Sequence, residues 1–532
     1  MTQKESMNTM GGSLKQNWGT VKNSLRLALA AATVLTLTQS VQAAEYLVKY
    51  RQGKAIASLF NMNHKIQVLD HNTTAQLIMV DLVDANKIGA LVSLASNPNV
   101  EYIVENFQLH SFSVVPYDGM PIESEALAKQ WAVEKVRAEA AWAKAGNRGS
   151  KNIKVAVIDT GVDYRHKSLA SNMTAGYDYA ENDNDPMDKT SAQNPGHGTH
   201  CAGIVGANGT AEGGTIGLSP EVTMLPIRFL DERGSGDLNN GIKAIDFAIA
   251  QKVHVISASW GAAVPRSTAL PLIEAVERAN KAGIIFVAAA ANDGKNNDTT
   301  EVYPANAGTA NTIVVAASGP NDTKPSWSNY GRAKVHVSSP GEAIISTLPG
   351  DKYGNLSGTS MATPLVAGLV ALLKAQDPSL TPLQMRSLLQ ATGVKVGINT
   401  ACDCRVDALN AIETVKAKKM FVSPNAATLG TSESMTFTGV YGSAPFQFVS
   451  SNPAVAEISS AGVLTAKTQG EVTVSVTDAG GQTASSYKIY VGATSGGTDP
   501  GQPGQPGECP LGDPQLCEII CRINPSAPFC KK

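Results

Sequence analysis

The sequence has little charge of either sign. Its 532 residues include 43 lysines and arginines against 45 aspartates and glutamates, so the formal net charge is −2, and charged residues make up 17% of the chain. Binding to nucleic acid or to an anionic membrane depends on a clear excess of positive charge. We therefore expect neither among the partners. With 43% hydrophobic residues the chain can bury large cores, and its length predicts two to four domains.

Long apolar runs are also missing beyond the N-terminus. Lys15, Lys22 and Arg26 precede the apolar segment LALAAATVLTLT, and small residues at 41–43 follow it. This order is typical of a signal peptide over residues 1–43, and the alternative is a buried N-terminal helix. No later segment reaches the ~18 apolar residues of a membrane span. We therefore expect a mature chain that is soluble and secreted, with a stay in the periplasm during transit left open.

Cysteine is scarce and unevenly placed. Because the chain has seven cysteines, at least one thiol is free or pairs outside the chain. Four of them crowd into residues 509–532, which predicts a small tail closed by two disulfides in one of three connectivities. Zinc is the alternative, but the tail has no CxxC pair. The four are Cys509, Cys517, Cys521 and Cys530. The disulfide partners of Cys402 and Cys404 stay open.

The remaining chain shows three patterns. Residues 44–112 carry alternating segments around the helix-like stretch DANKIGALVSLASN, which predicts a small α+β unit. Within residues 113–415, runs such as KVAVID and IIFVAAAA are apolar on both faces and alternate with helical segments, which predicts a doubly wound, mostly parallel α/β sheet. Residues 418–493 contain short β segments separated by turns, as in a β-sandwich, and 494–508 form a Gly/Pro linker.

Two segments of the α/β region suit acid–base chemistry. VIDTGVD places Asp159 at the end of an apolar strand, where functional groups of open α/β sheets collect. NPGHGTHCAG places His197 between two glycines. A histidine base needs a carboxylate to fix its tautomer, and Asp159 can serve. An aspartic protease is set aside because the nearest second candidate, Asp478, lies in the sandwich region. Zinc at His197 and His200 lacks an HExxH motif and a third ligand.

Two further segments suit the stabilisation of negative charge. FVAAAANDG ends a strand at Asn292, which is either an ordinary turn residue or an amide donor for an oxyanion. GNLSGTSMATPLVAG surrounds Ser360 with small residues where a helix begins. The amides and dipole at a helix start favour negative charge, and small neighbours give an acyl carbon access to the hydroxyl. We interpret Ser360 as a nucleophile, with a linker as the alternative.

The segments VIDTGVD, HGTHCAG, VAAAAND and GTSMATP, in this order, resemble the signatures of the subtilisin-like serine proteases, the S8 subtilases. The thermitase and proteinase K branches look most similar. The resemblance implies that Asp159 orients His197, which acts first as base and then as acid. It also implies that Ser360 attacks the substrate and that Asn292 stabilises the oxyanion together with the Ser360 backbone N–H. Ala291 departs from the glycine usual before the asparagine.

The same resemblance implies a substrate site. In relatives the substrate adds a strand to the segment that here is Ser259, Trp260 and Gly261, a mode that reads backbone more than side chains. We therefore expect a broad endopeptidase that favours apolar or aromatic side chains before the cleaved bond. The pocket for that side chain should be lined by Ala289, Ala290 and Val302, with Asp293 at its mouth.

Calcium is the cofactor that the resemblance suggests. YDYAENDNDPMD resembles the acidic calcium loop of thermitase, and closely spaced carboxylates suit a cation that needs 6–8 oxygen ligands. The alternative is a solvated acidic loop. The expected ligands are Asp178, Glu181, Asp183 and Asp185.

The flanking regions complete the prediction. Residues 44–112 resemble the family's inhibitory propeptide, with self-cleavage between Leu109 and Gly119. Residues 418–493 resemble a bacterial Ig-like domain of group 2, which implies adhesion or spacing. We predict a secreted, monomeric serine endopeptidase made as a self-processing zymogen, with polypeptide substrates and its own propeptide as partners. The alternative is an inactive, protease-like adhesin that acts through the Ig-like domain.

Overall fold

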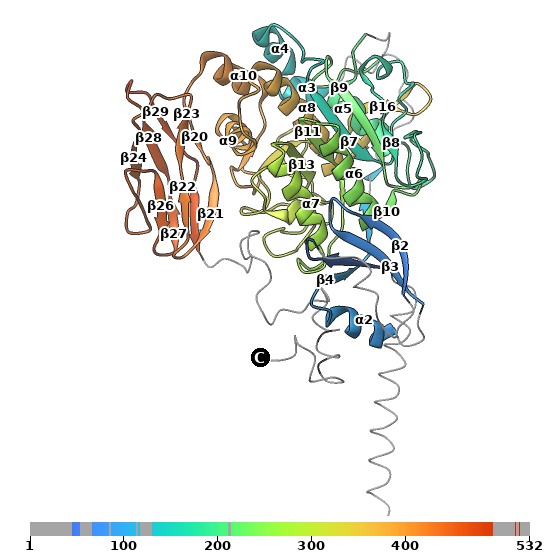
Figure 1. Ribbon diagram of the computed structural model, residues 1–532. Helices are drawn as coiled ribbons and strands as arrows, with labels where there is room; N and C mark the ends of the chain where they lie inside the picture. Colours follow the sequence, from blue (N-terminus) through green and yellow to red (C-terminus); the bar gives the residue numbers. More distant parts are fainter. Residues whose placement is uncertain are drawn as a thin grey trace, which may run out of the picture.

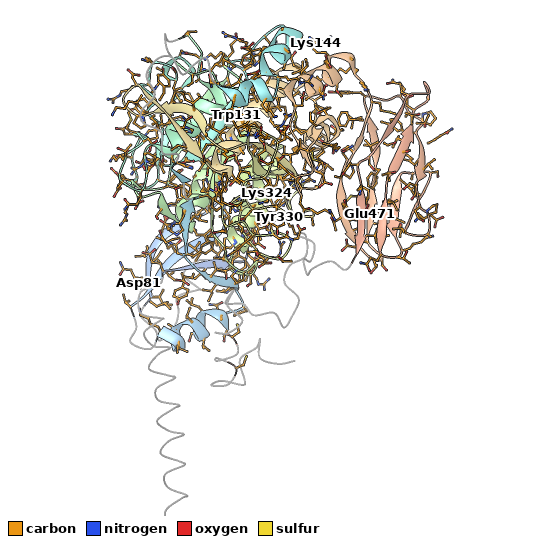
Figure 2. All side chains as sticks on the ribbon, turned by 180° about the vertical axis from the view of Figure 1, so that it is seen from behind. Asp81, Trp131, Lys144, Lys324, Tyr330 and Glu471 are labelled. Carbon is orange, nitrogen blue, oxygen red and sulfur yellow. A yellow bond between two sulfur atoms is a disulfide. The ribbon has the colours of Figure 1, made fainter. Side chains whose placement is uncertain are left out.

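The computed structural model describes residues 45–53, 66–83, 87–112, 115–116, 130–210 and 214–492, together with Cys517 and Cys521. They form an N-terminal module, a central α/β domain and a C-terminal β-module (Figure 1). Figure 2 shows them from behind, with Asp81 in the N-terminal module, Tyr330 in the central domain and Glu471 in the C-terminal module. The predicted signal peptide, the linker 494–508 and all but two residues of the tail lie outside the described residues.

The N-terminal module combines one sheet with one helix. Its elements are β1 (Tyr46–Tyr50), β2 (Ile66–Asn72), β3 (Leu77–Leu82), α2 (Lys87–Ala95) and β4 (Val100–Glu105). The antiparallel sheet has the order β2-β3-β1-β4, and α2 packs on it through Leu91 and Leu94. Leu47 and Tyr102 instead share a core with α6 (Leu238–Ala250) and α7 (Leu270–Lys281) of the central domain. The module is therefore docked on these two helices, as Figure 1 shows.

The central domain is built on a sheet of nine strands. In spatial order they are β18 (Val394–Lys395), β19 (Cys404–Arg405), β15 (Val337–Pro340), β14 (Thr312–Ser318), β13 (Ile285–Ala289), β11 (Val255–Ala258), β7 (Lys154–Asp159), β9 (Thr223–Arg228) and β8 (Tyr177–Asp178). All neighbouring strands are parallel except β18 and β19. The predicted doubly wound, mostly parallel sheet is confirmed.

Helices cover both faces of this sheet, which explains why its strands are apolar on both sides. On β7, Val155 and Val157 face the core shared with α5 and α8, whereas Ala156 and Ile158 face the core shared with α6 and α7. The remaining helices are α3 (Trp131–Lys135), α4 (Ala138–Ala145), α5 (His197–Gly206), α8 (Thr359–Gln376), α9 (Pro382–Thr392) and α10 (Ala408–Ala417), with short η3 (Ala170–Asn172) and η4 (Ala305–Ala307).

The strand ends converge at one edge of the sheet. Ile158, Ala258 and Ala288 are register partners in β7, β11 and β13, so these three strands reach the same level. Two small sheets lie beside this edge. One is β10 (Ser235–Asp237), β5 (Gln108–Ser111) and β12 (Trp260–Gly261), and the other is β16 (Ile344–Leu348), β17 (Lys352–Ser357) and β6 (Val115–Pro116).

The C-terminal module contains only strands. They are β20 (Phe421–Ser423), β21 (Ala427–Gly430), β22 (Ser434–Thr436), β23 (Thr438–Val440), β24 (Gln447–Ser450), β25 (Ala456–Ile458), β26 (Val463–Ala466), β27 (Gly470–Val472), β28 (Val474–Thr477), β29 (Thr483–Ser485) and β30 (Ile489–Gly492). Their pairings are antiparallel except for β21 with β30. A separate core fills the module, in agreement with a sandwich, but Phe421 and Val440 belong to the core of the central domain.

The cysteines fall into two states. Cys402 and Cys404 form a disulfide, Cys517 and Cys521 are disulfide-bonded, and Cys201 is a buried free thiol. Within the described ranges, no helix is both long and apolar enough to cross a membrane.

Candidate active site

Asp159 and His197 form a buried pair at the convergent strand ends. Asp159 is the last residue of β7 and His197 the first of α5, and each is 1% exposed. Asp159 Oδ1 lies 2.7 Å from His197 Nδ1 and also accepts the Thr160 N–H at 2.7 Å. Burial lowers the pKa of His197. The charge of Asp159 and, to a smaller extent, that of Cys201 outweigh this effect, so that the pKa of His197 lies well above its ordinary value.

Ser360 lies at the start of α8, beside the same histidine. The Cys201 thiol contacts both, with Sγ 3.3 Å from the Ser360 carbonyl oxygen and 4.0 Å from His197 Nδ1. The Ser360 hydroxyl donates to the Ser259 carbonyl at 3.2 Å, and the Ser259 hydroxyl donates to the Ser360 carbonyl at 3.0 Å. His197 Nε2 is buried and has no hydrogen-bond partner among the described residues. It is therefore available as a proton acceptor.

Asn292 is held in a fixed orientation next to Ser360. Its Oδ1 accepts the backbone N–H and the hydroxyl of Thr359, each at 2.9 Å. This leaves Nδ2 on the side of Gly358, where an added Cβ would lie 3.1 Å from that nitrogen. Two orienting bonds to the oxygen thus aim the amide donor at the first turn of α8. The four residues predicted from separate motifs meet at one place.

Ala291 precedes Asn292 in an unusual backbone conformation. Its φ is +88°, in the left-handed region that favours glycine, and its side chain is buried. The Asn329 N–H donates to the Ala291 carbonyl at 3.0 Å, which fixes this turn. The departure from glycine noted in the sequence therefore coincides with local backbone strain.

A segment of the chain itself occupies a groove beside Ser360. Strand β5 lies between β10 and β12 and is antiparallel to both. At its last residue, the Ser111 N–H donates to the Gly234 carbonyl at 2.8 Å, and just beyond it the Phe112 N–H donates to the Ser259 carbonyl at 3.4 Å. The resemblance predicted a strand on Ser259, Trp260 and Gly261, but it did not predict β10 as the opposite wall.

Two apolar side chains of this segment fill pockets. Phe112 packs against a cluster that includes Ala290 and Val302, and an added Cβ on Gly261 would lie 2.8 Å from its Cζ. Ala289, the last residue of β13, is buried but is not part of that cluster. Leu109 is completely buried.

The pocket of Leu109 depends on a glycine, Gly241, in its wall. A Cβ added at Gly241 would lie 2.9 Å from Leu109 Cδ1 and 3.3 Å from Phe229 Cε2. Glycine at position 241 therefore leaves room for leucine. Past the groove, the next described residues of the chain are those of β6, which pairs with β17, the strand that leads into Ser360. The segment thus runs across the site.

The acidic loop has a different arrangement from the one expected for calcium. The buried Arg228 donates to Asp178 Oδ2 at 2.5 Å and to Glu181 Oε1 at 3.0 Å, and Lys189 also binds Glu181. The other oxygen of Asp178 accepts two backbone N–H groups. A guanidinium therefore already takes the place of a cation at the inner carboxylates.

The outer carboxylates of this loop are also engaged. Asp183 accepts the backbone N–H of Asp185, and Asp185 accepts the Tyr164 hydroxyl at 2.8 Å. Among the described residues, Asp159, His197 and Cys201 form the sole group whose ligand atoms lie close enough together to hold a metal ion. The four predicted ligands do not form such a group among the described residues, and calcium binding at this loop stays a prediction. Arg228, 50 residues away in the sequence, was missed.

The comparisons with known proteins agree with this geometry. Residues 150–417 match the model of the subtilase family, and residues 416–489 match the bacterial Ig-like domain (group 2). Thermitase from Thermoactinomyces vulgaris is 38% identical over 288 residues, which cover 54% of this chain and 96% of thermitase. Subtilisin E from Bacillus subtilis (strain 168) is 36% identical over 310 residues, which cover 58% of this chain and 74% of subtilisin E.

A third relative extends further along the chain. The thermostable alkaline protease of Halalkalibacterium halodurans is 30% identical over 388 residues, which cover 71% of this chain and 95% of that protein. The predicted family and the predicted Ig-like domain are both confirmed. The chain belongs to the subtilase family of serine-type endopeptidases and carries a bacterial Ig-like domain C-terminal to its protease domain.

Proposed function

We propose that the chain hydrolyses peptide bonds through Asp159, His197, Ser360 and Asn292. The observation that carries this proposal is the 2.7 Å bond between Asp159 and His197, next to a serine in the first turn of α8. Asp159 keeps the proton of His197 on Nδ1, so that the lone pair of Nε2 is free to accept the Ser360 proton. The adjacent charge of Asp159 favours the positively charged ring that forms when His197 takes up this proton.

The reaction then follows from these positions. Ser360 Oγ bonds to the carbonyl carbon of the substrate as its proton passes to His197 Nε2. The Asn292 amide and the Ser360 backbone N–H donate to the oxygen that becomes negative. His197 returns the proton to the leaving amine, the C–N bond breaks, and an acyl-enzyme remains. Water, deprotonated by His197, releases the acid and restores Ser360.

The substrate is proposed to bind as an antiparallel strand between β10 and β12. The support is that residues 108–112 already lie there, joined through backbone hydrogen bonds to Gly234 and Ser259. Backbone pairing accepts many sequences, so we expect broad specificity. The pockets of Phe112 and Leu109 favour an aromatic or apolar residue before the cleaved bond and an apolar residue three positions earlier.

We further propose that residues 44–112 are an inhibitory propeptide of a secreted zymogen. In this position Phe112 precedes the bond that would face Ser360, so maturation occurs between Phe112 and Ser113. The propeptide also contacts α6 and α7 through polar bonds, including Lys49 to Glu274 at 2.8 Å. It blocks the groove until it is cleaved and released. Export itself rests on the signal-like residues 1–43.

Intact mass and N-terminal sequencing of the wild type beside Ser360→Ala test this function. The wild type should begin at Ser113 and digest casein. Ser360→Ala should stay uncleaved and lose about 10⁶-fold in kcat, as subtilisins do without their nucleophile. Ser387→Ala, which alters a buried serine of α9, is the control and should behave as wild type. Equal casein digestion by Ser360→Ala would refute the proposal.

A further inference from the structure

Asp188 is a buried carboxylate close to the candidate active site for which the mechanism above has no role. It is 5% exposed and lies nine residues before His197. Its Oδ1 accepts the Thr160 hydroxyl at 2.9 Å and the Asn194 amide at 3.3 Å. Its Oδ2 accepts the backbone N–H of Thr199 at 2.9 Å and the Thr199 hydroxyl at 2.7 Å. Four donors thus surround one carboxylate.

These donors adjoin the residues of the triad. Thr160 follows Asp159 directly, and its N–H donates to the Asp159 carboxylate. Thr199 lies one half-turn after His197 in α5. Through Thr160 and Thr199, Asp188 therefore connects the end of β7 to the start of α5, two elements that Figure 1 shows side by side.

The start of α5 depends on caps that lie outside the helix. Its N-cap residue is Gly196, which has no side chain to accept the first N–H groups. The His197 N–H donates to Asn194 Oδ1 at 2.7 Å, and the Gly198 N–H donates to Thr160 Oγ1 at 2.9 Å. The Thr199 N–H donates to Asp188. Since Asp188 also binds the other two capping side chains, it is the centre of the cap.

Charge supports the same arrangement. A carboxylate at a helix N-terminus is favourable because the peptide dipoles place partial positive charge there. Asp159 is the charged group that faces Asp188, and it disfavours a second negative charge. Burial, opposed by the bonds from Thr199 and Thr160, raises the pKa of Asp188 to about 6. Asp188 is therefore ionised at neutral and alkaline pH, in the form that accepts four hydrogen bonds.

We propose that Asp188 is a positioning residue for His197, holding the first turn of α5 against the end of β7 so that the imidazole stays on Asp159. This rests on the proposed function, because it assigns Asp188 to the same reaction. The described hydrogen bonds of the Asp188 carboxylate go to Thr160, Asn194 and Thr199, whereas the walls of the substrate groove are β10 and β12. Its loss should therefore slow the chemical step and leave substrate binding unchanged.

The test is the steady-state hydrolysis, at pH 8, of a chromogenic peptide anilide with phenylalanine before the cleaved bond, by the full-length, self-matured protein. Asp188→Asn should lower kcat on the order of 10- to 100-fold, as expected for a slightly misplaced base, with KM within twofold of wild type. Thr160→Val removes the bridging hydroxyl and should give a loss of the same kind. Combined with Asp188→Asn, it should add little, because both act through one network.

Asp163→Asn is the matched control. Asp163 is also buried, and its carboxylate accepts the backbone N–H groups of Arg165 and Gly350. Its backbone N–H donates to the Thr199 hydroxyl, a bond that Asp163→Asn leaves in place. It should lower the melting temperature and leave kcat unchanged. If Asp188→Asn does not mature, Thr199→Val replaces it and should lower kcat several-fold at constant KM. This substitution deletes the hydroxyl that donates to Asp188 and accepts the Asp163 backbone N–H.

The outcomes separate the two proposals. A kcat within twofold of wild type for Asp188→Asn, or an equal loss in Asp163→Asn, would overturn the positioning role and leave the proposed function intact, provided that Ser360→Ala is inactive. An active Ser360→Ala would overturn the proposed function itself.

Discussion

At the scale of single residues, Ala291 has a strained backbone conformation. A buried alanine with φ of +88° carries strain of the order of 1–3 kcal/mol, and it lies directly before the proposed oxyanion donor. The bond from the Asn329 N–H to the Ala291 carbonyl fixes this turn despite the strain, and Asn292 therefore keeps its orientation. Glycine would adopt the same backbone without this strain.

Ala291→Gly should therefore stabilise the fold. We expect a gain of about 1 kcal/mol, because relief of strain exceeds the greater backbone entropy that glycine loses on folding. The measurement is urea unfolding in the Ser360→Ala background, which prevents self-digestion. Ala282→Gly, at a helix end with φ of −81°, is the control and should not stabilise. A lower free energy of unfolding for Ala291→Gly would contradict the account.

His200 makes the stability depend on pH. Burial lowers its pKa to about 3, whereas an unfolded histidine titrates near 6.5. Below pH 6.5 the unfolded state binds the extra proton, so this stability is complete above pH 6.5 and falls as the pH drops towards 3. Burial also lowers the pKa of His336, which adds to the same trend.

His200→Gln should reduce that dependence. Glutamine can still donate to the Gly354 carbonyl, which His200 Nε2 meets at 3.0 Å, but it does not titrate. Between pH 7 and pH 5 we expect the free energy of unfolding to fall by about 2 kcal/mol less than in the parent protein. Urea unfolding of the uncleaved Ser360→Ala protein at the two pH values measures this, with the exposed His110→Gln as control. An unchanged difference would show that His200 does not contribute.

Short motifs identified the residues of the candidate active site because the neighbours typical of each role lie within a few positions of it in the sequence. Asp159, His197, Asn292 and Ser360 were all found this way. The role of Asp188 was not, because its partners Thr160 and Thr199 are set beside it only by folding. Arg228 was missed for the same reason, since it reaches the acidic loop from a strand 50 residues away.

At the scale of elements, β5 occupies the position proposed for the substrate strand. It supplies the strand that both β10 and β12 lack, and it carries Leu109 and Phe112 into their pockets. The resemblance to the family's propeptide predicted a cleavage region between Leu109 and Gly119 but not the residue that enters the pocket. That choice depends on the register between β5 and β12, which no local pattern encodes.

Phe112→Asp should slow self-cleavage on the order of 100-fold. A carboxylate would have to enter a pocket of alanine and valine side chains without a partner, which costs more than the loss of apolar contact alone. The time course of intact mass after refolding measures the rate. Gln108→Asp, at an exposed position of β5, is the control and should mature at the wild-type rate. Equal rates for both variants would place the cleaved bond elsewhere.

At the scale of the whole molecule, the Ig-like module is joined to the protease domain by specific contacts. Tyr441 donates to Asp377 at 2.9 Å, and Asp377 is the C-cap residue of α8, the helix whose first turn contains Ser360. Tyr487 donates to Asp403 at 2.8 Å, and the Lys395 ammonium lies 3.8 Å from the Tyr487 ring centroid. The resemblance to an Ig-like domain implied adhesion or spacing. These contacts and the shared core of Phe421 show in addition that the module packs against the protease domain.

The two domains should therefore unfold together. Calorimetry of the Ser360→Ala protein should show one transition for residues 130–492. In the same protein, Tyr487→Phe should lower the free energy of unfolding by about 1–2 kcal/mol, because a hydrogen bond to a carboxylate is lost. Tyr164→Phe removes an exposed bond of the same kind, to Asp185, and serves as control. Two separate transitions, or equal effects of the two substitutions, would mean that the module is an independent appendage.

The most direct test of the central claim is labelling of the mature protein with a fluorophosphonate, followed by peptide mapping. The reagent mimics the tetrahedral stage of acyl transfer and reacts with a serine that has an adjacent base and oxyanion donors. We predict one adduct per chain, on Ser360, with complete loss of casein digestion and no adduct in His197→Ala. An adduct on another residue, or full activity after Ser360 is labelled, would contradict the account.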